Sequence, residues 1–259
     1  MDILHLKHRL VTSPFGDVLK SVRRGLTSYR QLRNPELGLL YREDPMMEVI
    51  VAKALQRDSV CVDVGAHIGS MTQLFQKLAP KGAHVVIEAM PDKASWLRTA
   101  FPGLSVVQTA VSDREGEVSF FENLDRPGFS SLGARAGRTR EVTVPCTTLD
   151  ALLADRERID LIKIDVEGFE LDVVKGARDL LARCHPLVIF EAGSAVDKDI
   201  DNANYIALLD LFNDELGYEV RPVFGEYFQK PPITQAEFLA YRTYPYQAFN
   251  YVARPKPSM

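Results

Sequence analysis

Short apolar runs alternate with amphipathic segments along the chain from residue 59 onward. The runs have the length and the Val, Ile and Leu content of strands, and they are SVCVDV (59–64), AHVVIE (83–88), LSVVQTAV (104–111), IDLIKID (159–165) and PLVIFEA (186–192). The segments with helical spacing are 69–79, 92–101, 169–184 and about 202–216. Two more strands are predicted near 218–224 and 247–253.

Strands that alternate with helices of this length form βαβ units, which right-handed crossovers wind into a single sheet. The pattern therefore predicts a doubly wound, Rossmann-like α/β fold with a mostly parallel sheet and an antiparallel C-terminal strand. A β-pair is predicted for VSFFE (118–122) and REVTVPCTTL (140–149), on either side of a loop rich in Gly and Arg. The spacing from Thr147 to Asp150 resembles a helical capping box.

Two segments stand outside this alternation. Residues 1–45 are predicted to form an N-terminal helical extension that packs on the core or covers the site, and residues 46–259 to form one domain. The segment FQKPPITQAEFLAYRTYPY (228–246) is an insertion between the last two strands. Its aromatic residues and prolines predict an ordered lid or interface rather than a flexible linker.

Composition narrows the class of protein. The 259 residues carry a formal net charge of −4, so no global basic field indicates a nucleic-acid partner. Three cysteines without a CxxC pair argue against a disulfide framework or a structural zinc site and favour a reducing cytoplasm. The first residues lack the apolar core of a signal peptide, and no run of about 18 apolar residues is present. A cytoplasmic protein without a transmembrane helix is therefore expected.

Acidic residues mark the predicted strand ends. In an open parallel sheet, ligands bind outside the carboxyl ends of the strands. Asp63, Glu88, Asp165 and Glu191 each stand at such an end, and Asp113 closely follows the third strand. So many carboxylates at one edge exceed what solubility requires, and they predict a binding site there.

The first strand-to-helix turn, DVGAHIG, limits the classes of ligand that the predicted site can bind. Gly65 and Gly69 bracket a turn where a ligand can approach the backbone closely. A dinucleotide fingerprint needs glycine where this chain has His67, so that motif is broken. Asp63 disfavours a pyrophosphate and suits a positive amine, whereas Glu88, 23 residues beyond Gly65, is placed to accept both hydroxyls of a ribose. An amine and a ribose without a phosphate describe S-adenosylmethionine.

The chain resembles the FkbM-type family of S-adenosylmethionine-dependent methyltransferases. The blocks that carry the resemblance lie within about residues 45–192, and they are VCVDVGAHIGS, VVIEAMPD, AVSDREGEVSFFE, SSLG and TTLDALL…IDLIKIDVEGFELDVVKGA…PLVIFE. The resemblance implies a cofactor site at Asp63, Gly65, Gly69 and Glu88, with Ser112 and Asp113 near the adenine. Ala66, between the two glycines, is included in this predicted site. Family members commonly have Asn where this chain has His67.

The resemblance also implies the reaction. It is O-methylation of a hydroxyl group on a small metabolite, a sugar or a polyketide-type product of natural product biosynthesis, with S-adenosylhomocysteine as the second product. An alcohol acceptor must be aligned with the methyl carbon and gains from a nearby base. Alternation places Lys163, Asp165 and Glu167 towards one side of the strand end, with Asp165 lining the cofactor cleft near the methionine part. Glu167 is the first candidate base, followed by His67, Asp165 and Glu191.

Several alternatives stay open at this level. N-methylation of an amine would use the same cleft, and a non-catalytic cofactor-binding module would keep the same fold. A nucleotide-dependent oxidoreductase is disfavoured by the broken glycine motif. A homodimer through residues 228–246 is compatible with catalysis. Asp165 has the alternative of a salt bridge with Lys163, and Glu170 is expected to be structural, because a carboxylate in the first helical turn meets the helix dipole favourably.

A metal ion is not expected. Asp165, Glu167 and Glu191 offer oxygen ligands of the kind that Mg²⁺ takes, but the sequence contains no compact ligand motif. Ser130, Ser131 and the arginines of the surrounding loop either clamp an anionic acceptor or stay solvated.

Overall fold

A computed structural model describes residues 32–123, 130–131, 139–193 and 198–257. Its centre is a seven-stranded sheet with the order β10-β11-β9-β8-β1-β2-β3. The strands are β1 (Cys61–Val64), β2 (Val85–Ile87), β3 (Ser105–Val107), β8 (Leu161–Ile164), β9 (Leu187–Glu191), β10 (Tyr218–Pro222) and β11 (Asn250–Pro255). The strands β3, β2, β1, β8 and β9 pair in parallel, and β11 is antiparallel to both β9 and β10. The predicted mostly parallel sheet with an antiparallel C-terminal strand is confirmed.

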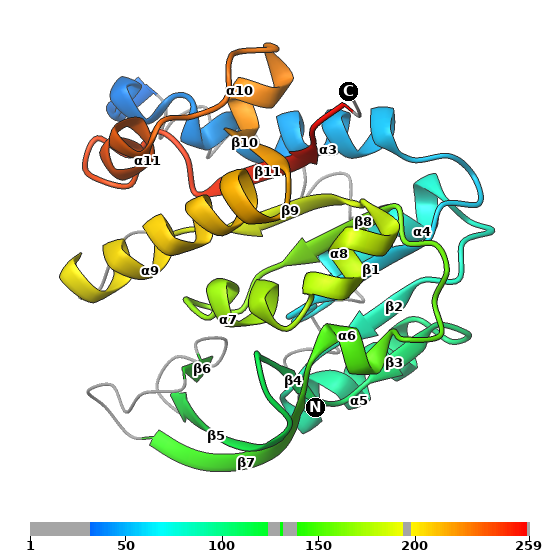
Figure 1. The fold of residues 1–259 in the computed structure, drawn as a ribbon. Coiled ribbons are helices and arrows are strands. Elements are labelled where there is room, and N and C mark those ends of the chain that lie inside the picture. The colour runs from blue at the N-terminus through cyan, green and yellow to red at the C-terminus, as the bar shows by residue number, and fades with distance from the viewer. Residues whose placement is uncertain (1–31, 124–129, 132–138, 194–197, 258–259) are drawn as a thin grey trace.

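Helices cover both faces of this sheet, as a doubly wound fold requires. They are α3 (Glu43–Ala54), α4 (Ser70–Leu78), α5 (Pro91–Ala100), α6 (Leu149–Leu152), α7 (Glu170–Lys175), α8 (Arg178–Cys184), α9 (Lys198–Asp210), α10 (Val223–Tyr227) and α11 (Gln235–Tyr241). Two short 3₁₀ turns precede α3, at Pro35–Leu37 and Leu40–Arg42, and a π-helical turn, Leu211–Glu215, extends α9. In Figure 1, α7, α8 and α9 lie in front of the sheet, and α3 and α4 lie behind it. Every residue of β1 and β8 is buried, so these strands form the centre of the core.

The single strand predicted over residues 104–111 is wrong, because the chain passes there from one sheet to another. β3 belongs to the main sheet, whereas β4 (Ala110–Val111) belongs to a second, four-stranded sheet with the order β4-β7-β5-β6. Between them, the Thr109 hydroxyl donates to the carbonyl of Pro145 in the second sheet, at 3.0 Å. The predicted β-pair is confirmed as β5 (Gly116–Asn123) and β7 (Thr139–Thr147), which pair antiparallel; β6 is Ser130–Ser131.

The single helix predicted over 169–184 is also wrong, since α7 ends at Lys175 and α8 begins at Arg178. Gly176 stands at the break, and a Cβ atom there would lie 2.1 Å from the carbonyl oxygen of Ser112. The close approach of these two backbones therefore requires glycine.

The predicted capping box from Thr147 to Asp150 is wrong. The hydroxyl of Thr148, not Thr147, caps α6 by accepting from the amide of Ala151. The carboxylate of Asp150 accepts instead from the amides of Asp179 and Leu180 in the first turn of α8. Asp150 thus caps a helix 29 residues further along the chain.

The predicted boundary between residues 45 and 46 falls inside α3. Met46, Met47 and Ile50 of this helix belong to the main hydrophobic core. The Glu43 carboxylate accepts hydrogen bonds from the amides of Phe249 and Asn250 at the start of β11. The division into an extension and a domain remains a prediction, because residues 1–31 lie outside the described residues.

The segment 228–246 contains α11 and is anchored in the core. Its Phe238 is fully buried and lies against the rings of Tyr205 and Tyr251. In the described part of the chain, no helix combines the length and the apolar character that a membrane span needs.

Candidate active site

A cavity of about 400 Å³ lies at the carboxyl ends of β1, β2, β8 and β9. This volume is in the range of small-molecule sites. Most residues that the sequence singled out line it, namely Asp63, Gly65, Ala66, His67, Glu88, Ser112, Asp165, Glu167 and Glu191. The carboxyl edge of the sheet is therefore where the structure brings these residues together.

Gly69 and Asp113 are absent from the cavity wall. Gly69 precedes α4 with a φ of +84°, and a Cβ atom there would lie 2.3 Å from the ring of Phe101. Its glycine is thus required by helix packing and by a left-handed backbone. Asp113 accepts a hydrogen bond from the hydroxyl of its neighbour Ser112, at 3.3 Å. The cofactor role of Gly69 and Asp113 therefore remains a prediction.

Asp63 is a buried acid at the end of β1. The hydroxyl of Thr72, one turn into α4, donates to its Oδ2 at 2.5 Å. Burial raises the pKa of Asp63 to about 6, although the hydrogen bond from Thr72 and the charge of Lys163 lower it. A charged carboxylate in such a place is stabilised by a cation that comes within a few ångströms.

Glu88 directly follows β2 and fastens the first turn to the second strand. Its Oε2 accepts from the amide of His67 and its Oε1 from the amide of Met90, both at 2.9 Å. Burial raises the pKa of Glu88, against the charge of Lys93. Both carboxylate oxygens thus stand at fixed positions on the cavity wall.

Gly65 lines the cavity, and packing also requires glycine at this position. A Cβ atom at Gly65 would lie 1.9 Å from the carbonyl oxygen of Asp165 in the backbone that leaves β8. The close approach of a ligand to this turn remains a prediction. His67 has a φ of +52°. Asn, Asp and His are the side-chain-bearing residues found most often in this left-handed region. Either Asn or His therefore suits the backbone at position 67.

Four charged residues share one face of the sheet at this edge. Lys163 pairs in register with Asp63 across β1 and β8, and alternation places Asp165 on the same face as Lys163. The Lys163 ammonium is buried, 3.5 Å from Asp165 Oδ2 and 3.2 Å from the carbonyl oxygen of Ile164. The alternative of an Asp165–Lys163 salt bridge is present, and Asp165 nevertheless lines the cavity.

Glu191 completes this group from the end of β9. Burial and, next, the charge of Asp165 raise the pKa of Glu191 to about 8, against the charge of Lys163. Burial and the nearby carboxylate thus favour the protonated form of Glu191, which can share its proton with Asp165.

The turn after β8 is held in an uncommon backbone conformation. Glu167 is exposed and has a φ of +56°, and Gly168 follows with a φ of +103°. Glu170 Oε1 accepts from the amides of Val166 and Gly168, both at 3.2 Å. Glu170 is structural, as predicted, but through these hydrogen bonds to its own turn. Positive φ at a residue with a side chain often marks a functional site.

The family model described as Methyltransferase FkbM domain matches residues 63–220. The chain belongs to the FkbM methyltransferase family. The 2-O-methyltransferase NoeI of Sinorhizobium fredii is 27% identical over 155 residues, which cover 52% of this chain and 63% of NoeI. The methyltransferase sdnD of Sordaria araneosa is 26% identical over 188 residues, which cover 58% of this chain and 72% of sdnD. The match to NoeI thus spans less than two thirds of that relative.

A solved FkbM methyltransferase structure from Methylobacillus flagellatus superposes with a TM-score of 0.47 at 17% identity. The superposition covers 77% of this chain and 44% of that one. The strand order defines the fold, and the match over residues 63–220 defines the family.

Two residues of the site in this FkbM methyltransferase were not among the predicted site residues. Alternation placed Lys163 on the same side of the strand end as Asp165, but no role in the site was assigned to it, and it lines the cavity. Thr72 gave no signal, because its contact to Asp63 depends on how α4 is set against β1. Among the residues whose side chains are described, no group of three or more His, Cys, Asp or Glu is arranged to hold a metal ion. The loop arginines and the side chains of Ser130 and Ser131 lie outside that set.

Proposed function

We propose that this FkbM methyltransferase uses S-adenosylmethionine to methylate a hydroxyl group of a small metabolite. The observation that carries the proposal is the pair of buried carboxylates, Asp63 and Glu88, at the ends of adjacent parallel strands. Burial of a carboxylate is unfavourable unless a hydrogen-bond donor or a cation offsets it. A ligand with one ammonium group and a ribose supplies both.

The two carboxylates suit different parts of this cofactor. We assign Asp63 to the ammonium group of the methionine part. Each oxygen of Glu88 already accepts one amide hydrogen, and an ionised carboxylate has about two acceptor sites per oxygen. One acceptor site on each oxygen therefore remains for the two hydroxyls of a ribose. Apolar side chains of the second sheet, Val118 and Phe120, line the same cavity and suit the adenine ring.

The balance of charge favours a cationic cofactor. The acidic residues that line the cavity are Asp63, Glu88, Asp165, Glu167, Asp172 and Glu191, and the lysines and arginines are Lys93, Arg114 and Lys163. When bound, S-adenosylmethionine supplies a methyl group on a positively charged sulfur. The excess of carboxylates attracts such a ligand and releases the uncharged sulfur of S-adenosylhomocysteine more readily.

The acidic turns supply the proton acceptor. The hydroxyl of the acceptor must lose its proton as the new oxygen–carbon bond forms. Since burial and the nearby carboxylate favour the protonated form of Glu191, we assign the base to Glu167, followed by Asp165 and His67, and we assign to Glu191 a hydrogen bond to Asp165. A base of this kind contributes about 10²–10⁴-fold to the rate.

The relative NoeI, by its name a 2-O-methyltransferase, supports a hydroxyl acceptor. The acidic turns favour an amine as the second candidate acceptor, because carboxylates bind an ammonium group and accept its proton. We further propose that the enzyme needs no metal ion, acts in the cytoplasm and serves natural product biosynthesis. The first proposal is supported by the lack of a group of metal-ligating residues among the described side chains, and the second by the three free cysteines. The third is supported by the resemblance of the sequence to the FkbM-type family.

Calorimetric titration with S-adenosylhomocysteine tests the proposal. Wild type is expected to bind with a micromolar dissociation constant, and Glu88→Ala to lose binding. Asp160→Ala is the matched control, because Asp160 is an acid just before β8, at the opposite edge of the sheet, and does not line the cavity. A folded wild type that binds neither S-adenosylhomocysteine nor S-adenosylmethionine refutes the proposal. If it binds, methyl transfer to a panel of hydroxylated and amine acceptors, followed by mass spectrometry, identifies the acceptor class.

A further inference from the structure

The acids of the cavity stand on two turns that leave neighbouring strands. The first turn, 165–168, follows β8 and carries Asp165 and Glu167, and the second, 191–193, starts with Glu191 at the end of β9. Two buried side chains contact these turns from behind, Glu170 the first turn and Arg242 the second, and buried Tyr205 contacts both of these side chains. None of the three lines the cavity.

The first turn is held by Glu170 and, through it, by α9. Glu170 is 1% exposed, and its Oε1 accepts from the amides on both sides of Glu167. Its other oxygen, Oε2, accepts from the hydroxyl of Tyr205 at 3.1 Å. The Tyr205 hydroxyl therefore fixes the orientation of the carboxylate that stabilises the left-handed conformation of Glu167.

The second turn is held by Arg242, which directly follows α11. Its Nε donates to the carbonyl oxygens of Ala192 at 3.2 Å and Gly193 at 3.0 Å, the two residues after Glu191. Its guanidinium carbon lies 3.9 Å from the ring centre of Tyr205. Arg242 is 4% exposed, and burial of a guanidinium among neutral carbonyl groups is unfavourable unless its geometry is specific. Tyr205 thus contacts the supports of both turns.

We propose that Tyr205 and Arg242 are positioning residues that hold the two acid-bearing turns at a fixed separation for proton transfer. Arg242 lies in the segment 228–246, which contributes none of the described cavity-lining residues. This segment therefore acts on the site from behind the turns and is not a lid over the cavity. The inference rests on the proposed function, since it takes the acids on these turns as the groups that move the proton.

The first test compares two tyrosines that lose only a hydroxyl. Tyr205→Phe keeps the ring under Arg242 and removes the hydrogen bond to Glu170, whereas Tyr251→Phe removes a buried hydroxyl without a hydrogen-bond partner in the described part of the chain. Hydrogen exchange at the amides of Val166 and Gly168 is the measurement. We expect exchange about 10-fold faster or more in Tyr205→Phe and unchanged exchange in Tyr251→Phe. Unchanged exchange in Tyr205→Phe, or an equal rise in both variants, overturns the proposal.

The second test separates positioning from folding. With the acceptor that the screen identifies, Tyr205→Phe is expected to lower kcat about 10-fold or more while KM for the donor stays within about twofold. Arg242→Lys should keep more of kcat than Arg242→Met, because it keeps a cation that can reach the carbonyl groups. Weakened donor binding with unchanged kcat contradicts the proposal. If wild type binds no S-adenosylhomocysteine, the proposed function fails, and the exchange comparison still decides whether Tyr205 holds the turn.

Discussion

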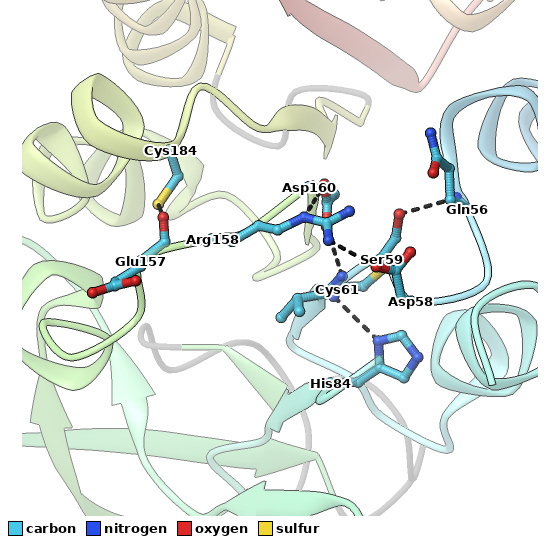
Figure 2. Close-up of polar contacts among 10 residues, drawn as sticks. Gln56, Asp58, Ser59, Cys61, His84, Glu157, Arg158, Asp160 and Cys184 are labelled. Atoms are coloured by element: carbon cyan, nitrogen blue, oxygen red, sulfur yellow. Dashed lines mark hydrogen bonds and ion pairs between the residues drawn. The ribbon is translucent and has the colours of Figure 1, made fainter. Parts of the chain in front are cut away.

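The two edges of the main sheet carry similar side chains and arrange them in opposite ways. At the amino edge, just before β1 and β8, Arg158 lies between two aspartates (Figure 2). Its Nη1 is 3.1 Å from Asp58 Oδ2, and its Nε is 3.0 Å from Asp160 Oδ1. The second oxygen of Asp160 accepts from the amide of Val60 at 2.7 Å. These charges satisfy one another at the surface.

At the carboxyl edge, Asp63, Glu88, Asp165 and Glu191 are buried or half-buried. Together with the exposed Glu167, these carboxylates outnumber the cations. Lys163 is the single lysine or arginine among the four charged residues that share one sheet face there, and it faces Asp63, Asp165 and Glu191. Burial raises the pKa of Asp63 to about 6 and that of Glu191 to about 8, whereas the hydrogen bond from Arg158 lowers the pKa of Asp58. At the amino edge, the charges are thus paired with one another. At the carboxyl edge, an added cation would stabilise the carboxylates. That difference separates a structural ion pair from a candidate active site.

The largest expected effect concerns ligand binding. Asp63→Ala should raise the dissociation constant of S-adenosylhomocysteine by about 100-fold or more, because loss of one partner of a buried charge pair costs about 2–5 kcal/mol. Asp160→Ala, at the opposite edge, should leave that constant unchanged. Isothermal titration calorimetry of both variants provides the measurement. Equal losses in the two variants would show that the effect is a general loss of folding.

The next effect contrasts Glu167, in the turn 165–168, with Glu170, which contacts this turn from the start of α7. Glu170→Ala should lower the free energy of unfolding by about 2–4 kcal/mol, because it leaves two amides and the Tyr205 hydroxyl without their acceptor. Glu167→Ala, at an exposed position, should change it by about 0.5 kcal/mol or less. Urea denaturation measures both. A similar loss in the two variants would contradict the structural role given to Glu170.

The two edges should also respond to pH in opposite directions. The pKa of Glu191 is 4.5 in the unfolded chain and about 8 in the folded protein. Between these two pH values, Glu191 is protonated in the folded protein and ionised in the unfolded chain. Its contribution to stability is therefore fully present below about pH 4.5 and is lost as the pH rises to about 8. Asp58 has a lowered pKa, so its contribution is present above its ordinary pKa of 3.8 and is lost on acidification.

Glu191→Gln isolates the first of these responses. From about pH 5.5 to pH 8, wild type should lose about 1 kcal/mol or more of unfolding free energy relative to Glu191→Gln. The reason is that one unit of pKa shift is worth about 1.4 kcal/mol. Denaturation at a series of pH values measures it. Parallel pH profiles for the two proteins would mean that Glu191 titrates normally.

The smallest effect is expected at the amino edge. Arg158→Gln should change stability little, because exposed ion pairs contribute weakly and are screened by salt. Thermal unfolding at low and high ionic strength measures the change. A large, salt-independent loss would mean that this edge is not a surface ion pair.

The sequence predicted the features that depend on neighbouring residues and missed those that depend on contacts between distant residues. Asp63, Glu88, Asp165 and Glu191 were found because parallel strands place their carboxyl ends at one edge, and alternation alone marks those ends. The apolar runs likewise predicted the parallel sheet. Both are properties of short segments.

The features that were missed depend on distant contacts. The strand break at Thr109 depends on Pro145, and the helix break at Gly176 depends on Ser112. The hydrogen bonds from Arg242 to the carbonyl oxygens of Ala192 and Gly193, next to Glu191, join residues about 50 positions apart. No local pattern encodes such a contact, because it arises only once the second sheet and α11 have packed.

The central claim is that Asp63, in its charged form, binds the ammonium group of the cofactor. The most direct test is calorimetric titration of wild type and Asp63→Asn with S-adenosylhomocysteine from about pH 5 to pH 8. Because the pKa of Asp63 is about 6, the dissociation constant of wild type should level off above that pH and rise up to about tenfold per pH unit below it. Asp63→Asn should bind weakly, without this dependence. Tight binding by Asp63→Asn, or wild-type binding that ignores pH across this range, would contradict the account.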